Sequence, residues 1–123
     1  MYKIKVQTQF SAAHFLRNYK GKCESLHGHN WRIEVLVSSE GLSSSGMVMD
    51  FSELKKMTND VIEILDHKNL NELDYFGKHN PSSEEIANYI FLRLKEGIAS
   101  YNCKLDEVRV WETDSSCASY TED

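Results

Sequence analysis

The chain is poor in proline and cysteine, and it has no long hydrophobic run. Its one proline, Pro81, does not mark a linker, so nothing divides the 123 residues into separate units. Its three cysteines, Cys23, Cys103 and Cys117, are odd in number and far apart, which argues against a disulfide framework and predicts a reduced, cytoplasmic protein. A membrane-spanning helix needs roughly 18 apolar residues in a row, and no segment comes close to that.

Positive charge is scarce as well, since 14 Lys and Arg residues stand against 19 Asp and Glu residues, a formal net charge of −5. This balance excludes broad binding to DNA or RNA, which requires a basic face. We therefore expect neither a nucleic acid nor a membrane as partner. There is still room for a local basic pocket that binds a phosphorylated small molecule. With 41% hydrophobic and 27% charged residues, the composition is that of a globular protein, and the length fits one domain over residues 1–123.

Apolar and polar residues alternate with a period of two in three segments, residues 2–10, 27–38 and 105–113. This period is typical of half-buried strands. The segment 40–46 is a turn by composition, because it combines two glycines with three serines. It predicts a hairpin from the second strand to a short further strand at residues 47–49.

Two helices are predicted between these strands. Asp50 or Ser52 can cap the first, whose stripe has helical spacing: Phe51, Leu54, Thr58, Val61 and Leu65. The second begins after Pro81, where Ser82 and Glu85 form a capping box, and it ends near Gly97.

The order of these elements indicates an α+β fold, in which an antiparallel sheet carries two helices on one face. A sheet this small has edges that must be covered, so we expect an oligomer.

The segment His27-Gly28-His29 is the strongest chemical signal. Histidines at i and i+2 on a strand point the same way, so they can reach one metal ion. His14 follows the first strand, and antiparallel pairing of the two strands brings it beside His27. Three imidazoles with a free fourth position are the pattern of a catalytic zinc site, whereas Cys23 as fourth ligand would make a closed structural site.

Cys23, Asp66 and His67 are candidates for proton transfer. A thiol near a metal or a histidinium has a lowered pKa, so Cys23 can serve as nucleophile or general base. Asp66 beside His67 can orient the imidazole and raise its basicity, provided that the end of the first helix supplies an irregular backbone. Otherwise Asp66 is a solvated loop residue, and His67 interacts only with the helix C-terminus.

Glu112 lies on the apolar side of the last strand, after Val108 and Val110. A buried carboxylate there is costly unless it meets matched donors. A ligand with an N–H edge would supply them, and the alternative is a strand-end glutamate that reaches water.

Together these motifs resemble the 6-pyruvoyl-tetrahydropterin synthase family, and the ordered matches run from about residue 2 to residue 115. They are Phe10-Ser11-Ala12-Ala13-His14, Cys23-x3-His27-Gly28-His29-Asn30, Asp50-Phe51, Leu65-Asp66-His67-x2-Leu70-Asn71, Pro81-Ser82-Ser83-Glu84 and Val110-x-Glu112-Thr113. The three residues between Cys23 and His27 resemble the spacing of the bacterial branch, the 6-carboxy-tetrahydropterin synthases.

The resemblance implies a tunnelling fold, with a four-stranded antiparallel sheet backed by two helices and sheets joined into a barrel. It further implies a homohexamer, built as two trimers with active sites at subunit interfaces. The implied zinc ligands are His14, His27 and His29. The implied catalytic residues are Cys23, Asp66 and His67. The implied pterin-binding residues are Glu112, Ser82, Ser83 and Glu84.

The implied reaction converts 7,8-dihydroneopterin triphosphate to 6-carboxy-5,6,7,8-tetrahydropterin, acetaldehyde and triphosphate, a carbon–carbon lyase step toward queuosine. Glu24 is a departure, because in a folate-related branch an acidic residue near this place replaces the cysteine and yields 6-hydroxymethyl-dihydropterin. The pattern is also compatible with formation of 6-pyruvoyl-tetrahydropterin and with a noncatalytic module that binds zinc or a pterin. Arg17, Lys20 and Lys22 lie near the metal motif and could bind the triphosphate or belong to a solvated loop.

Overall fold

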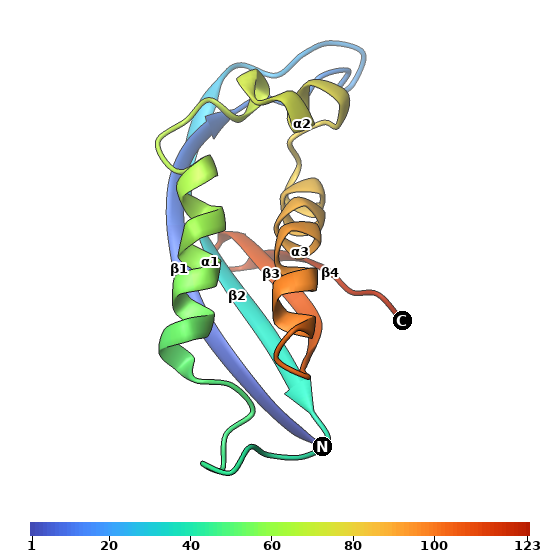
Figure 1. The fold of residues 1–123 in the computed structure, drawn as a ribbon. Coiled ribbons are helices and arrows are strands. Elements are labelled where there is room, and N and C mark those ends of the chain that lie inside the picture. Colours follow the sequence, from blue (N-terminus) through green and yellow to red (C-terminus); the bar gives the residue numbers. More distant parts are fainter.

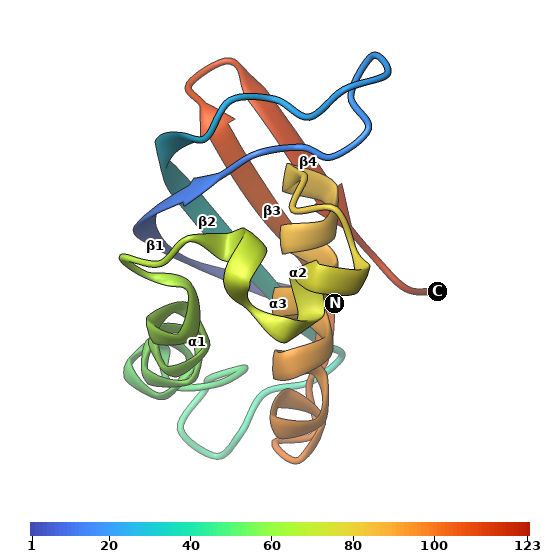
Figure 2. The same ribbon diagram turned by 90° about the horizontal axis from the view of Figure 1, so that it is seen from above.

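The computed structural model describes residues 1–123, and it contains one four-stranded antiparallel sheet with the strand order β1-β2-β3-β4. In chain order the elements are β1 (Tyr2–His14), β2 (His27–Ser39), α1 (Phe51–Leu65), the 3-10 helix η1 (Leu70–Glu72), α2 (Asp74–Lys78), α3 (Ser83–Ala99), β3 (Lys104–Thr113) and β4 (Ser116–Tyr120). The long helices α1 and α3 lie side by side over the same face of the sheet (Figures 1 and 2). The prediction of an α+β fold with a four-stranded antiparallel sheet and helices is confirmed. None of the helices has the length and apolar character needed to cross a membrane.

The core lies between the helices and the inner face of the sheet. The alternation in β2 leaves four side chains on this face fully buried: Trp31, Ile33, Val35 and Val37. Val108 and Val110 of β3 extend the same layer, and Leu54 of α1 and Ile90 of α3 cover it. The period of two therefore identified the buried face correctly.

Both helix starts use the predicted capping side chains, but the capping box at the second is only half formed. The N–H of Ser82 donates to the carbonyl of Asn80, and the carboxylate of Glu85 accepts from the hydroxyl of Tyr75 instead. The side chain of Asp50 accepts a hydrogen bond from the backbone N–H of Ser52, and that of Ser82 accepts one from the N–H of Glu85. These bonds satisfy donors that a helix start leaves free, which explains why α1 and α3 begin where they do. Phe51, placed in the apolar stripe of the first helix, is 54% exposed and does not belong to the core.

The strand predicted at residues 47–49 is wrong. These residues form an irregular segment between a turn and α1, in which Met49 packs into the core. β2 already pairs with β1 on one side and β3 on the other, so no free edge beside it can accept a further strand. The fourth strand is instead β4, which pairs with β3 and was not predicted. Its sequence, SCASY, offers no apolar alternation by which to recognise it.

Candidate metal centre and its surroundings

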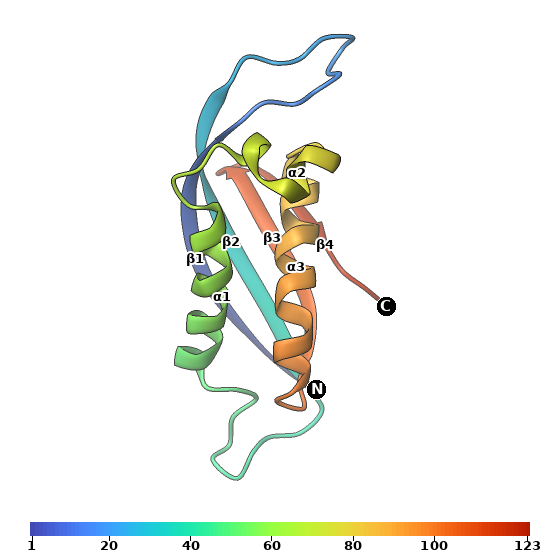
Figure 3. The same ribbon diagram turned by 45° about the horizontal axis from the view of Figure 1, so that its top comes forward.

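Strand register brings three histidines together at one end of the sheet. His14 ends β1 directly opposite His27, the first residue of β2, and His29 follows two residues later. One ligand nitrogen from each ring lies within 4.8 Å of the others. The loop of residues 15–26 joins the two strands and extends beyond this end of the sheet (Figure 3).

Backbone carbonyls fix the tautomers of two of these rings. The Nδ1 of His14 lies 2.7 Å from the carbonyl oxygen of Pro81, and the Nδ1 of His27 lies 2.8 Å from that of Ser25. A carbonyl can only accept, so each Nδ1 carries the hydrogen and each Nε2 presents a lone pair. The two Nε2 atoms lie 3.1 Å apart. Two lone pairs this close are unfavourable alone and favourable around a shared cation.

The surroundings of the third ring, His29, also favour a cation shared by the three histidines. The Nε2 of His29 is buried and has no hydrogen-bond partner within the chain. Burial, reinforced by the neighbouring His27 and His29, lowers the pKa of His14, although its hydrogen bond to Pro81 opposes this shift. His14 is therefore neutral at pH 7, the form in which imidazole binds metals. The three histidines could hold a metal ion.

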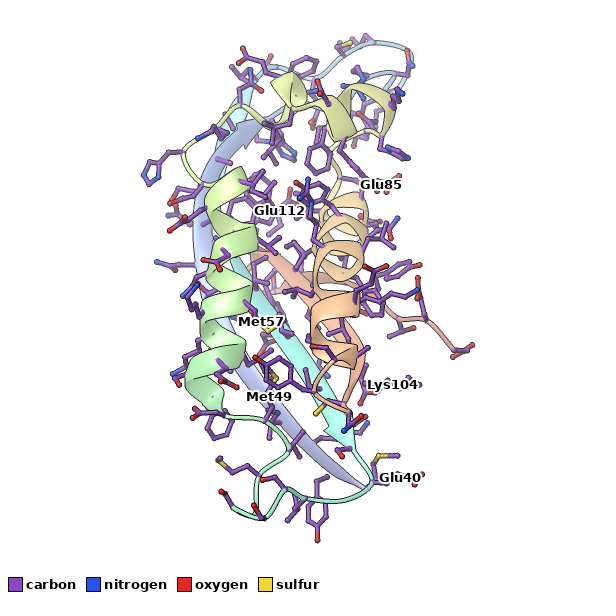
Figure 4. The ribbon with its side chains drawn as sticks, in the orientation of Figure 1. Glu40, Met49, Met57, Glu85, Lys104 and Glu112 are labelled. Carbon is purple, nitrogen blue, oxygen red and sulfur yellow. The ribbon has the colours of Figure 1, made fainter.

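Glu112 faces this cluster from β3. One carboxylate oxygen, Oε1, lies 3.3 Å from the Nε2 of His29 and 3.7 Å from the Nε2 of His14. Glu112 lies where the register between β3 and β4 shifts, and its side chain is 34% exposed. It is labelled in Figure 4 near the upper ends of α1 and α3. Its carboxylate is thus half-buried beside the histidines, with one part open to a ligand.

The start of α3 borders the same region. Ser83 and Glu84 line a pocket of about 160 Å³ together with Glu112 and residues 116–118 of β4. The hydroxyl of Ser82 is engaged in the helix cap instead. Three of the four residues predicted to bind a pterin ring therefore share one pocket, and the fourth holds the helix that carries two of them.

Trp31 is part of the site, although the sequence identified it only as an inward-facing residue of the second strand. It is fully buried, and its ring lies edge-to-face against His14 at 4.9 Å and against His29 at 5.1 Å between centroids. Its Nε1 lies 3.4 Å from the hydroxyl of Ser83. The signal available in the sequence was its position two residues after His29, on the same face of the strand.

Asp66 and His67 are in direct contact. Asp66 caps α1, and His67 adopts a left-handed backbone with φ of 58°. This irregular backbone lets Oδ2 of Asp66 lie 2.9 Å from Nδ1 of His67. The N–H of Ser11 donates to the other carboxylate oxygen, and this bond, together with His67, lowers the pKa of Asp66. The imidazole of His67 is 80% exposed, in an open cleft beside Lys68.

Cys23 does not join this pair within one chain. It lies exposed in the loop of residues 15–26, and no hydrogen bond or ion pair connects it to Asp66 or His67. It is also outside the group of residues that could hold a metal, which consists of the three histidines alone. A closed site with the sulfur as fourth ligand is therefore not formed in this chain.

Glu24, next to Cys23, is held by the backbone. Its carboxylate accepts a hydrogen bond from the N–H of Leu16 at 3.0 Å, and its own N–H donates to the carbonyl of Leu16 at 2.9 Å. These two bonds close the base of the loop. Arg17 is engaged too, because its guanidinium donates to the carbonyl of Phe76 at 2.7 Å.

The fold and the site define an α+β protein with three histidines that could hold a metal ion at the end of an antiparallel sheet. Residues 3–123 match the 6-pyruvoyl tetrahydropterin synthase family. The chain belongs to this enzyme family.

Two relatives and one solved structure place it more closely. It is 43% identical to a 6-carboxy-5,6,7,8-tetrahydropterin synthase of Synechocystis sp., over 98% of this chain and 93% of the relative. It is 37% identical to a dihydroneopterin monophosphate aldolase of Pyrococcus furiosus, over 89% of both chains. The structure of Caenorhabditis elegans 6-pyruvoyl tetrahydropterin synthase superposes with a TM-score of 0.86 at 29% identity, over 99% of this chain and 96% of that one.

Proposed function

We propose that this protein is a 6-carboxy-5,6,7,8-tetrahydropterin synthase. It converts 7,8-dihydroneopterin triphosphate to 6-carboxy-tetrahydropterin, acetaldehyde and triphosphate, and so acts as a carbon–carbon lyase in the cytoplasmic route to queuosine. The observation that carries the proposal is the convergence of three imidazoles beside the half-exposed Glu112. The name of the Synechocystis relative supports the product.

The metal in this proposal is Zn²⁺, held by His14, His27 and His29. The all-nitrogen donor set suits zinc, and the chain supplies three ligands, as catalytic zinc sites do. When bound, zinc supplies a Lewis acid at the substrate's side chain. The carbonyls of Pro81 and Ser25 hold two of the ligands in the binding tautomer.

The pterin ring lies in the pocket between the start of α3 and the end of β3. The free part of the Glu112 carboxylate accepts hydrogen bonds from the N–H and amino groups of the ring. Ser83 and Glu84 line the same pocket, and Ser82 fixes the helix start behind them. This arrangement orients the substrate so that its side chain faces the histidines.

Proton transfer is assigned to Cys23 and His67, with Asp66 orienting the imidazole. Because Cys23 makes no contact with this pair within one chain, we propose that two copies contribute to one site. The exposure of both Cys23 and His67 supports this arrangement. The sheet ends in two edge strands, β1 and β4, which can pair between copies into a barrel. We therefore propose a homohexamer of two trimers.

A folate-type aldolase that forms 6-hydroxymethyl-dihydropterin is the second candidate, and the Pyrococcus furiosus relative favours it. In that reaction Glu24 would act in place of Cys23. The hydrogen bond from the N–H of Leu16 gives the carboxylate of Glu24 a structural task, whereas the thiol of Cys23 is free. The geometry therefore favours the cysteine-dependent reaction over the aldolase.

Incubation of the zinc-loaded protein with 7,8-dihydroneopterin triphosphate, followed by mass spectrometry, tests the proposal. We expect 6-carboxy-tetrahydropterin and acetaldehyde in equal amounts, and neither product from Cys23→Ala. Release of 6-hydroxymethyl-dihydropterin would establish the aldolase reaction. Release of 6-pyruvoyl-tetrahydropterin would establish the reaction for which the Caenorhabditis elegans protein is named. Absence of any turnover would leave a metal- or pterin-binding module.

A further inference from the structure

We propose that Trp31 is a positioning residue that holds His14 and His29 for the metal and links them to Ser83 in the ring pocket. Only the pocket half of this inference rests on the proposed function, because the metal half concerns binding alone. The side chain of Trp31 contacts two of the metal-binding rings and the start of α3 at the same time.

The first step concerns the orientation of the imidazoles. The ring of Trp31 meets His14 at an interplanar angle of 88° and His29 at 62°. It also stacks on Phe10, with centroids 5.2 Å apart and an angle of 18°. Aromatic pairs favour such edge-to-face and stacked arrangements. Since Trp31 is fully buried between these rings, it cannot rotate without displacing a metal ligand.

The second step concerns His29 in particular. His14 and His27 are each anchored through Nδ1 to a backbone carbonyl. No hydrogen bond anchors either nitrogen of His29. Packing against Trp31 therefore helps to restrain this ring, together with the two neighbouring histidine rings and the carboxylate of Glu112. Outer contacts orient metal ligands, and loss of a hydrogen-bonded outer partner typically costs about 10- to 100-fold in metal affinity. For a packing contact we take the lower end of that range.

The third step links the metal centre to the pocket. The Nε1 of Trp31 is 3.4 Å from the hydroxyl of Ser83, a long hydrogen bond that ties β2 to the first residue of α3. Ser83 lines the pocket with Glu112, and Glu112 in turn approaches His29. Trp31 thus contacts two of the histidine rings and one residue of the ring pocket, so the indole helps to set the distance between the pocket and the metal.

Two replacements of Trp31 separate these tasks. Trp31→Phe keeps an aromatic ring against the histidines but removes the N–H together with the rest of the five-membered ring, whereas Trp31→Leu removes the aromatic ring altogether. Zn²⁺ affinity is measured by competition with a chromophoric chelator, and ring affinity by equilibrium binding of 7,8-dihydroneopterin. Phe91→Leu is the matched control, because Phe91 is a similarly buried aromatic residue packed against Tyr120 instead of the histidines.

We expect Trp31→Leu to weaken Zn²⁺ binding by about 10-fold or more, and Trp31→Phe to stay within about threefold of the wild type. Trp31→Phe and Ser83→Ala should each weaken dihydroneopterin binding by a similar factor, and the double variant should be no worse than either. Phe91→Leu should reduce thermal stability and leave both affinities unchanged.

Wild-type Zn²⁺ affinity in folded Trp31→Leu, judged by circular dichroism, would overturn the metal half. Additive losses in the double variant would overturn the link to Ser83. A protein that fails the product assay but shows the expected Zn²⁺ losses would refute the proposed function and leave the metal half of this inference standing.

Discussion

Replacement of Glu24 distinguishes a carboxylate that closes a loop from one that transfers a proton. Its side chain accepts a hydrogen bond from the N–H of Leu16, and that bond helps to fix the loop carrying Cys23. Glutamine keeps an acceptor oxygen at the same position but cannot act as an acid or base. Alanine removes the acceptor altogether. The two substitutions therefore have different consequences under the two hypotheses.

The magnitudes follow from the single contact. A hydrogen bond to a charged group contributes about 1.5–3 kcal/mol, and a neutral one about 0.5–1.5 kcal/mol. At roughly 1.4 kcal/mol for each factor of ten, Glu24→Ala should reduce kcat/KM by about 10- to 100-fold through loss of the closed loop. Glu24→Gln should lose less than about tenfold. A catalytic carboxylate would instead lose roughly 10²–10⁴-fold in the glutamine variant.

The assay is steady-state formation of 6-carboxy-tetrahydropterin, with Cys23→Ala as the reference for loss of chemistry. Circular dichroism confirms that each variant is folded. Equal losses above about 100-fold in Glu24→Gln and Glu24→Ala would refute the structural role. Retention of turnover in Cys23→Ala would also contradict this reasoning, since the loop that Glu24 fixes would then carry no residue that the reaction requires.

Three further predictions concern the metal, the buried carboxylate of Glu34 and the pair formed by Asp66 and His67. Zn²⁺ at about 100 times its Kd should raise Tm by roughly 10 °C, and His29→Ala should abolish this shift in differential scanning fluorimetry; an unchanged shift would exclude His29 as a ligand. Glu34→Ala should lower the free energy of unfolding by about 2–4 kcal/mol in urea titrations, because it removes the shared acceptor of Trp111 and Lys5; a loss below about 1 kcal/mol would contradict this. Asp66 has a pKa below its ordinary 3.8, so its stabilising effect is complete above that pH and is lost as the pH falls through the lower value in the folded protein. The stability difference between wild type and Asp66→Asn should therefore shrink in acid, and a difference that grows there would reverse the assignment.

The sequence predicted most of what local pattern controls. Alternation in β2 identified its buried face, and Ser82 with Glu85 located the start of α3. The antiparallel pairing that places His14 opposite His27 followed from strand order and from chain direction. These features depend on neighbours close in the chain or on one simple pairing, which explains the agreement.

The failures arise where distant residues decide the outcome. Glu34 alternates as an outward residue, yet it is 4% exposed because Gln7, Lys5 and Trp111 from two neighbouring strands surround its carboxylate. Those hydrogen bonds outweigh the effect of burial and lower its pKa. β4 exists because β3 offers it an edge, and its own composition gives no sign of this.

In the site, too, the features set by local pattern were predicted and those set by distant residues were not. The sequence located the histidines and Glu112, and the pairing of Asp66 with His67 follows from the end of α1. The sequence placed Trp31 on the same face as His29 but did not reveal its contacts with the histidines, because a buried aromatic residue on a strand gives the same pattern whether it packs on leucine or on imidazole. The separation of Cys23 from Asp66 and His67 was also beyond a single sequence, since it depends on the path that the loop of residues 15–26 takes in three dimensions.

His14 and His27 stand at the last and first positions of two paired strands, so the register of the sheet determines where these two candidate ligands meet. The connection across residues 15–26 carries Cys23 and Glu24 but supplies no ligand. Its length and reactive side chains can therefore change during evolution while the metal-binding rings stay in place. Changes confined to the loop between β1 and β2 can in this way alter the reaction that the same fold catalyses. This agrees with a family whose members are named for different pterin reactions.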